Sequence, residues 1–172
     1  KDVRWTLVFQ HKPLWVYNNA PGWAEIEALL NDRQHTVFAG HFHTYTKYER
    51  NNGKYFVLAT TGGGSGLRGP IYGQFDHVVW VTMTDAGPRV ANLILEGIWD
   101  EDVHNEETAG LMDPLLQGGA VGIQPIFAEE MEFSGGSTIV RLTNDADVPL
   151  EISGSFADNA QLAVSPASFK RI

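Results

Sequence analysis

Histidine is the side chain whose type and spacing point most directly to chemistry in this sequence. Two histidines flank a phenylalanine in Gly40-His41-Phe42-His43, and a third, His11, precedes Lys12-Pro13. Neutral imidazole is the commonest metal ligand in proteins, and we expect Gly40 to provide the sharp backbone turn that presents both imidazoles of the pair. At this chain's glycine and histidine frequencies, Gly-His-x-His would arise by chance in roughly 2% of such sequences. The surroundings of the motif therefore have to decide its meaning.

Each histidine motif comes directly after a predicted buried strand. Residues 4–10 and 36–39 are short apolar runs typical of parallel strands, and residues 23–30 between them carry apolar side chains at helical spacing. Strand, helix and strand in this order form a βαβ pattern, which brings the carboxyl ends of both strands to one edge of a sheet. Open α/β sheets bind their ligands at that edge, so we expect the three histidines to converge there as metal ligands.

The other three histidines are expected to lie outside such a site. His35 comes before a strand, at the opposite edge of the sheet, and is expected to be structural. His77 stands beside Asp76 at the start of a strand, and a hydrogen-bonding role is expected, with metal or substrate contact as the alternative. His104 lies in an acidic stretch and is expected to be exposed.

From residue 44 onward the sequence favours β-structure. Asn51-Asn52-Gly53 separates two apolar runs, and Asn-Gly dipeptides provide the positive φ of a tight hairpin turn. Residues 85–88 predict a second hairpin. The expected strands cover residues 44–49, 54–60, 77–84 and 89–95.

A glycine-rich loop, residues 62–73, separates the two predicted hairpins. It lacks the Gly-Lys-Ser or Gly-Lys-Thr of a nucleotide-binding P-loop. Two interpretations stay open: its backbone N–H groups approach an anionic substrate, as they do in anion-binding nests, or the loop is a flexible connection between strands.

Charge is unevenly distributed and indicates how the chain is divided. Residues 1–95 carry nine basic and seven acidic side chains, whereas the rest of the chain carries three and fourteen. We assign residues 1–96 to one domain, residues 97–126 to an acidic linker with at most one helical turn, and residues 127–172 to a β-sandwich-like segment. In this segment we expect short strands at residues 137–143, 150–156 and 161–164. An immunoglobulin-like sandwich needs about 100 residues, so this segment is either incomplete or packs on the first domain.

Composition excludes several classes of protein. The 172 residues include no cysteine, so disulfides, thiolate nucleophiles, zinc ribbons and iron–sulfur clusters are impossible. The net charge of −9 argues against nucleic-acid binding. The longest apolar runs fall well short of the roughly 20 residues that a membrane span needs.

The order of these motifs resembles the C-terminal part of the calcineurin-like metallophosphoesterases, and the purple acid phosphatase branch in particular. Residues 9–14 carry the single histidine before a proline, residues 37–45 carry the paired histidines, and residues 60–64 follow after a strand pair. The resemblance covers about residues 4–96. It implies the C-terminal half of a layered α/β fold that hydrolyses a phosphoester with metal-activated water. The implied cofactors are two divalent or trivalent transition-metal ions (Fe, Zn or Mn), with His11 and His41 on the second and His43 on the first.

The sequence also departs from this family. The family's Asp-x-His, Gly-Asp-x-x-Asp and Gly-Asn-His-Asp or Glu motifs do not occur in residues 1–172. Three neutral imidazoles cannot bridge two metal ions or offset their charge, which carboxylates do in two-metal hydrolases. We therefore expect this chain to be the C-terminal fragment of such an enzyme, inactive alone. Its expected partners are the phosphoester substrate and the upstream part of the same domain.

Other functions fit the sequence less well. A cupin needs a glutamate soon after the histidine pair, and Glu49 comes late; an amidohydrolase barrel needs about 250 residues. The main alternative is a non-catalytic, β-rich binding or adhesion module with a structural or vestigial histidine metal site. The acidic residues 100–107 lack the spacing of an EF-hand loop. The β segment and the resemblance together favour an extracytoplasmic location.

Overall fold

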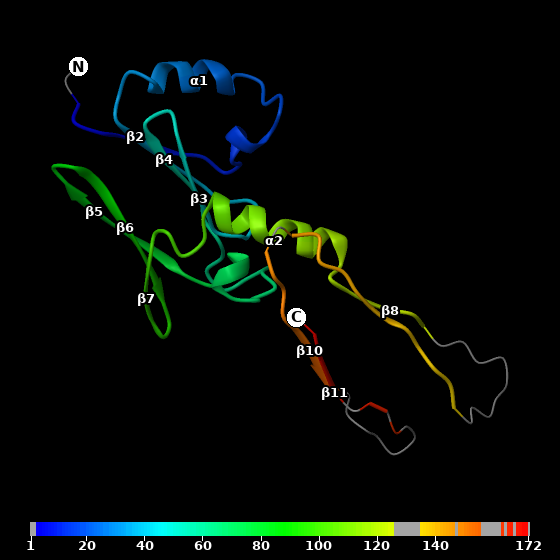
Figure 1. Ribbon diagram of the computed structural model, residues 1–172. Helices are drawn as coiled ribbons and strands as arrows, with labels where there is room; N and C mark the ends of the chain where they lie inside the picture. The colour runs from blue at the N-terminus through cyan, green and yellow to red at the C-terminus, as the bar shows by residue number, and fades with distance from the viewer. Residues whose placement is uncertain are drawn as a thin grey trace. The chain divides into compact units, whose positions relative to one another are not determined.

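The computed structural model describes residues 3–125, 135–146, 148–155, 163, 165–166 and 168–171 (Figure 1). The chain forms two compact units, Lys1–Gly110 and Leu111–Ile172. The candidate site lies in the first unit.

The first unit is built on a four-stranded sheet in the order β1-β2-β4-β3. These strands are β1 (Thr6–Phe9), β2 (His35–Ala39), β4 (Gly53–Val57) and β3 (Thr46–Arg50). β1, β2 and β4 run parallel, and β3 pairs with β4 in the antiparallel sense. A short 3-10 helix (Leu14–Val16) and helix α1 (Trp23–Leu30) connect β1 to β2. The predicted strand, helix and strand are thus confirmed.

Packing on both faces of this sheet follows from the alternation of side chains along β2 and β4. Val37 and Tyr55 belong to a core on one face, with Trp23 and Leu30 of α1. Phe38 joins a second core on the other face, with Tyr45, Phe56, Phe75 and Val90. Figure 1 shows α1 on one side of the sheet and β5 and β6 on the other. The register is therefore well specified, because a slip of one residue would exchange the two faces.

The second sheet of this unit is antiparallel and contains β5 (Val78–Thr84), β6 (Gly87–Ile94) and β7 (Gly97–Asp100). Both predicted hairpins are present, β3–β4 and β5–β6. In the first, Arg50 pairs with Gly53, so Asn51 and Asn52 are the two central residues, with φ of 50° and 56°. The positive φ angles thus fall on an Asn-Asn pair, with the glycine already in the strand.

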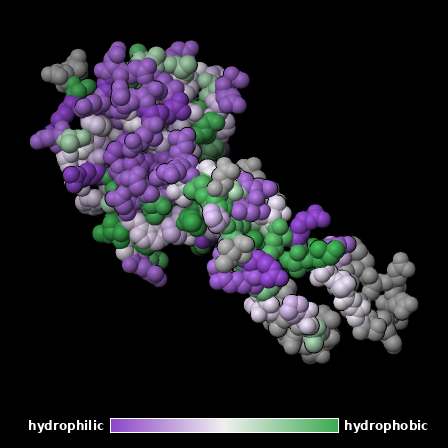
Figure 2. All heavy atoms as spheres, viewed as in Figure 1, coloured by the Kyte–Doolittle hydropathy of each residue, from purple (hydrophilic) through white to green (hydrophobic). Residues whose placement is uncertain are grey.

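Several large apolar side chains remain at the surface of the first unit. Phe9 on the edge strand β1, Trp80 on β5 and Ile98 on β7 are each more than half exposed. In the view of Figure 2, hydrophilic residues cover much of the first unit, with hydrophobic residues between them. A folded protein always exposes some apolar surface, so single residues of this kind need a neighbour or a pattern before they carry meaning.

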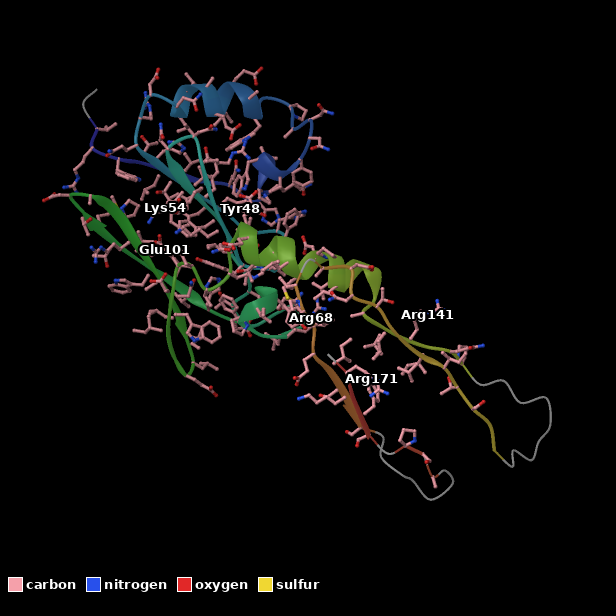
Figure 3. All side chains as sticks on the ribbon, viewed as in Figure 1. Tyr48, Lys54, Arg68, Glu101, Arg141 and Arg171 are labelled. Atoms are coloured by element: carbon pink, nitrogen blue, oxygen red, sulfur yellow. The ribbon has the colours of Figure 1, made fainter. Side chains whose placement is uncertain are left out.

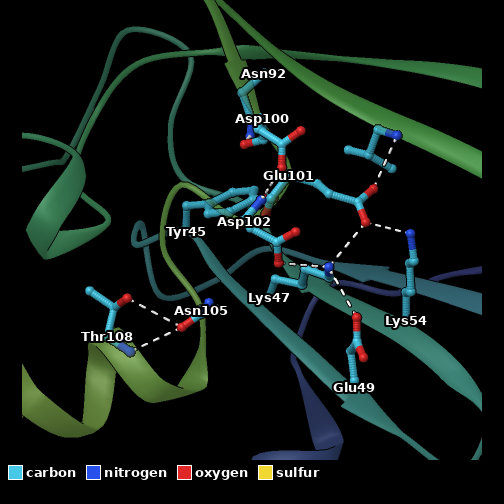
Figure 4. Close-up of polar contacts among 11 residues, drawn as sticks. Tyr45, Lys47, Glu49, Lys54, Asn92, Asp100, Glu101, Asp102, Asn105 and Thr108 are labelled. Atoms are coloured by element: carbon cyan, nitrogen blue, oxygen red, sulfur yellow. Dashed lines mark hydrogen bonds and ion pairs between the residues drawn. The ribbon is translucent and has the colours of Figure 1, made fainter.

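A buried ion cluster ties residues 100–105 to the first sheet. Lys47, whose side chain is 5% exposed, lies 3.0 Å from Glu101, 2.7 Å from Asp102 and 3.0 Å from Glu49. Glu101 also pairs with Lys54, which Figure 3 shows beside it, and Figure 4 shows the whole cluster. Burial alone would lower the pKa of Lys47, but the three carboxylates raise it. Burial would raise the pKa of Glu101, and the two lysines lower it.

The prediction that residues 97–126 are irregular, with at most one helical turn, was wrong. The stretch forms β7, helix α2 (Glu106–Gly118) and β8 (Val121–Ile123). Asn105 caps α2, since its Oδ1 accepts the Thr108 backbone N–H at 3.0 Å. The acidic residues suggested solvated chain, but Glu101 serves a buried lysine, and Glu106 and Glu107 lie in the first turn of α2, where the helix dipole favours them.

The second unit contains small antiparallel sheets. β8 pairs with β9 (Val140–Leu142), and β10 (Ile152–Ser155) pairs with β11 (Ser168–Arg171). β9 and β10 fall in two of the runs that the sequence favours as strands. The expected strand at residues 161–164 and the start of the segment at residue 127 lie almost entirely outside the described residues. The β-sandwich-like segment over residues 127–172 therefore stays a prediction.

The fold class that the structure supports is β-rich. Small sheets predominate and helices are few. Within the described ranges, the alternation of strands and helices that defines a layered α/β fold is limited to β1, α1 and β2. The α/β class was therefore predicted for more of the chain than shows it. None of the helices in the described part of the chain combines the length and the apolar character that a bilayer crossing requires.

Candidate metal centre

The parallel strands bring three loops together at the carboxyl edge of the first sheet. His11 follows β1, His41 follows β2, and the glycine-rich loop begins shortly after β4. Backbone hydrogen bonds extend past the strands: the Gly40 N–H donates to the His11 carbonyl at 3.0 Å, and the Leu58 N–H donates to the Ala39 carbonyl at 2.7 Å. The sheet itself therefore positions the candidate residues, at the edge where parallel sheets bind ligands.

His11 and His41 are brought into direct contact at this edge. His11 Nε2 lies 3.1 Å from His41 Nδ1, and the two rings meet edge to face with centroids 5.0 Å apart. Both side chains are exposed to solvent. Because a neutral imidazole has one N–H and one acceptor nitrogen, one ring donates to the other when no metal is bound.

The spacing of these two nitrogens fits a shared metal ion. Ligand nitrogens lie about 2.0–2.1 Å from zinc, which is usually tetrahedral, so two of them on one ion are about 3.3 Å apart. The observed separation is 3.1 Å. The separation therefore matches that of two ligands on one ion, and the hydrogen bond between the rings has to open before both nitrogens can bind it.

The charge state of His41 also suits a ligand. Partial desolvation comes first among the causes that lower the pKa of His41 below its ordinary value of 6.5, followed by the positive charges of Lys12, His11 and His43. At neutral pH the imidazole is then predominantly neutral, which is the form that binds a metal ion.

His43 is held differently. Its Nδ1 lies 2.9 Å from the carbonyl oxygen of Gly64 in the glycine-rich loop. In the described residues, no three His, Asp or Glu side chains come together as one complete metal site. The structure thus joins His11 to His41 and leaves His43 nearby, attached to the neighbouring loop. The assignment of all three as metal ligands stays a prediction.

Backbone strain falls on the two paired histidines. His41 has φ of 76° and His43 has φ of 56°, in the left-handed region that residues with a Cβ rarely adopt. Gly40, which we expected to make the turn, does not have a positive φ. Left-handed backbone costs about 1–2 kcal/mol per non-glycine residue, and such strain is concentrated at functional sites.

The glycine-rich loop is anchored at its base by Asp76, which sequence reasoning did not place in this role. Its Oδ1 accepts hydrogen bonds from the Thr60 hydroxyl at 2.6 Å and from the Gly62 N–H at 2.9 Å. These bonds lower the pKa of Asp76, so the carboxylate is ionised at neutral pH. The contact spans 16 residues of chain, and no local pattern in the sequence signals it.

His35 and His77 are structural, as expected. The His35 Nδ1–H donates to the Arg33 carbonyl, and its Nε2 accepts from the Tyr55 hydroxyl, both at 2.9 Å. Both ring nitrogens of buried His77 are also hydrogen-bonded.

His77 Nε2 accepts the Ala59 backbone N–H at 3.1 Å, and its Nδ1–H donates to Asn92 Oδ1 at 2.8 Å. Burial lowers the pKa of His77, and the contacts with Asn92 and Asp76 act in the opposite direction. The expected hydrogen-bonding role is confirmed, and a neutral imidazole with this pair of partners has no lone pair left for a metal ion.

The expectation for His104 was wrong. Its side chain is only 2% exposed, and its carbonyl accepts the Lys47 backbone N–H at 3.1 Å. The residue is buried because residues 100–105 fold back against β3. Local acidity suggested a solvated position, but the position is determined by the ion cluster around Lys47.

A broad hollow lies at the opposite edge of the sheet from these histidines. It has a volume of about 560 Å³ and is lined by Trp5, Lys54 and the turn between β3 and β4, with Ala86 and Pro88. It contains none of the candidate ligands and belongs to a different part of the first unit.

No protein-family model, curated protein or solved structure matches this chain. The case for a function therefore depends on the residues and their geometry.

Proposed function

We propose that the chain is the C-terminal part of a metal-dependent phosphoesterase of the calcineurin-like kind. The observation that carries the proposal is the pair His11 Nε2 and His41 Nδ1, 3.1 Å apart at the carboxyl edge of a parallel sheet. His43, from the same loop as His41, would supply a third imidazole. The β1-α1-β2 unit is the part of the layered α/β fold that this assignment needs.

In this proposal each residue has a defined task. His11 and His41 hold the second metal ion and His43 holds the first, as the resemblance in motif order implies. When bound, the ions acidify a water molecule and neutralise charge on the phosphoryl oxygens. The chain places the nitrogens of His11 and His41 3.1 Å apart, and desolvation lowers the pKa of His41, which favours its neutral form. No protein nucleophile is needed, which agrees with the absence of cysteine.

The complete site would need carboxylates from outside this chain. Within the described residues, no Asp or Glu joins His11 and His41 to form a metal-binding group. Parallel strands are normally covered on both faces and flanked by neighbours, yet β1 is an edge strand of its sheet and Phe9 on it is exposed. We therefore propose that an upstream part of the same domain pairs with this edge and that residues 1–172 alone are inactive.

The charge of the first half is compatible with a phosphoester. Residues 1–95 carry nine basic and seven acidic side chains, a net charge of +2, so the acidic total of the chain describes its second half. A strongly acidic surface around the histidines would repel an anionic substrate, and this part of the sequence does not provide one.

Metal analysis of the full-length protein tests the proposal. We expect His43→Ala to lose bound transition metal and at least 100-fold in the hydrolysis of an aryl phosphate. Phe42→Ala is the matched control, because it changes the same loop and keeps both imidazoles. Unchanged metal content and rate in His43→Ala would refute the phosphoesterase assignment. For residues 1–172 alone we expect weak zinc binding at most, and tight binding of two transition-metal ions would contradict the incomplete site.

A second candidate is a non-catalytic β-rich binding module with a vestigial metal site. Val78, Trp80 and Ile98 favour it, because all three are more than half exposed on one face of the second sheet, where Leu93 pairs with both Val78 and Ile98. The same experiment separates the two functions. The binding-module function would be supported by a full-length protein that binds metal but hydrolyses no aryl phosphate. Its His43→Ala variant would then bind its partner as the wild type does.

A further inference from the structure

We propose that Gly64 is a positioning residue of the candidate metal centre, whose backbone carbonyl fixes the tautomer of His43. Metal ligation by His43 rests on the proposed function above; the tautomer itself does not. The inference assigns the glycine-rich loop a role different from the two considered from the sequence, since it acts through a carbonyl on a side chain.

The first argument is the hydrogen bond. His43 Nδ1 and the Gly64 carbonyl oxygen are 2.9 Å apart. A carbonyl oxygen can only accept, so Nδ1 must carry the hydrogen, and in the neutral imidazole Nε2 then holds the lone pair. Histidines that bind metals usually donate their other N–H to a carbonyl or carboxylate, which orients the ring and raises its basicity. Nε2 of His43 is therefore the nitrogen prepared for a ligand.

The second argument is the space at position 64. A Cβ on Gly64 would lie 2.7 Å from His43 Nδ1 and 2.8 Å from its Cε1, closer than real Cβ atoms approach. Gly64 also has φ of 67°, which favours glycine. Only a residue without a side chain allows the loop to lie against the imidazole ring in this way.

The third argument is that hydrogen bonds hold the start of the loop in place. Asp76 accepts hydrogen bonds from Thr60 and from Gly62. The hydroxyl of Thr61 donates to the His77 carbonyl at 2.8 Å. Two residues before Gly64, the chain is thus hydrogen-bonded to residues 76–77, which lead into β5, and these bonds hold the part of the loop from which the Gly64 carbonyl contacts His43.

The two histidines of the pair consequently present different nitrogens. His41 turns Nδ1 toward His11, whereas His43 turns Nδ1 toward Gly64 and leaves Nε2 for a ligand. A change at Gly64 should therefore affect His43 and leave the contact between His11 and His41 intact.

Three neighbouring glycines provide a matched set of variants. Gly63→Ala adds a Cβ with no atom within 4 Å at a φ outside the left-handed region; Gly62→Ala adds backbone strain at φ of 92°, also with open space. Gly64→Ala adds both the strain and the collision with His43. Comparing the three separates the contact from general disturbance of the loop.

The readout is the tautomer of each histidine, measured by ¹⁵N–¹H correlation NMR of residues 1–172 at pH 8, followed by titration of the full-length protein and its variants with Zn²⁺. We expect His43 to be protonated on Nδ1 in the wild type, Gly62→Ala and Gly63→Ala, and to lose this preference in Gly64→Ala. Zinc affinity should fall about 10-fold in Gly64→Ala, the low end of the cost of removing such a hydrogen bond, and less than 2-fold in the other two.

The signals of buried His77 report whether each variant is folded. An Nε2-protonated His43 in the wild type would overturn the proposal whether or not Gly64→Ala folds, as would equal loss of the tautomer in Gly62→Ala and Gly64→Ala. Loss of the tautomer in Gly64→Ala alone, with no zinc binding by the full-length wild type or by any of its variants, would support the role of Gly64 and count against the proposed function.

Discussion

Replacing Glu101 by glutamine tests whether residues 100–105 are an integral part of the first unit. The side chain is 12% exposed, and its Oε1 lies 3.0 Å from Lys47 Nζ and also pairs with Lys54. Its Oε2 accepts the Val90 N–H at 3.3 Å. Glutamine keeps the size and one acceptor oxygen and removes the charge.

The expected cost follows from what each lysine loses. A hydrogen bond to a charged group contributes about 1.5–3 kcal/mol, and removing one partner of a buried ion pair costs about 3–5 kcal/mol when the other is left alone. Lys47 keeps Asp102 at 2.7 Å and Glu49 at 3.0 Å. Lys54 is about one-third exposed, so water replaces part of its loss. We therefore expect Glu101→Gln to lower the free energy of unfolding by about 2–3 kcal/mol.

Urea unfolding at pH 7, followed by tryptophan fluorescence, measures this cost in the right place, because all five tryptophans lie in residues 1–110. Asp102→Asn and Glu49→Gln are matched controls, since these carboxylates contact the same lysine but are 56% and 70% exposed. Exposed ion pairs contribute at most about 1 kcal/mol. If Glu101→Gln cost no more than its two controls, the reasoning from burial would be wrong.

Two further predictions concern buried histidines. Burial lowers the pKa of His77 below its ordinary 6.5, so the unfolded chain binds a proton that the folded chain does not, and the free energy of unfolding should fall as the pH drops below about 6.5. Denaturant unfolding measured from pH 8 to 5 should show a weaker pH dependence for His77→Gln than for the wild type. Identical pH dependence of the two proteins would contradict this assignment. Gly53→Ala would place a Cβ against the buried imidazole of His35 and should cost about 2 kcal/mol, whereas Gly97→Ala, with no atom within 4 Å, should stay within about 0.5 kcal/mol in the same denaturation assay.

The parts of the fold that could be predicted from the sequence are those with a short-range signal. The apolar runs and the helical spacing of residues 23–30 identified β1, α1 and β2, since burial on both faces leaves a continuous apolar pattern. The position of His11 and His41 beside each other followed from the parallel sheet. Turn residues identified both hairpins, although Asn51 and Asn52, and not Asn-Gly, form the first turn.

What could not be predicted depends on partners far along the chain. Glu101 reads as a solvated acid until Lys47, 54 residues earlier, is placed beside it. His104 is buried for the same reason. The contact of His43 with Gly64 spans 21 residues and uses a backbone carbonyl, which leaves no mark on residue type except the glycine itself. Charge and composition describe segments, whereas these contacts are between individual atoms.

The left-handed backbone at His41 and His43 lowers the stability of the loop at the two positions that provide candidate metal ligands. Glycine at either position would relieve about 1 kcal/mol of strain and remove an imidazole. A substitution that relaxes the backbone at either position therefore also removes a candidate ligand. Selection of variants for thermal stability alone would favour glycine at these two positions. It would thereby remove the imidazoles that the sheet brings to this edge.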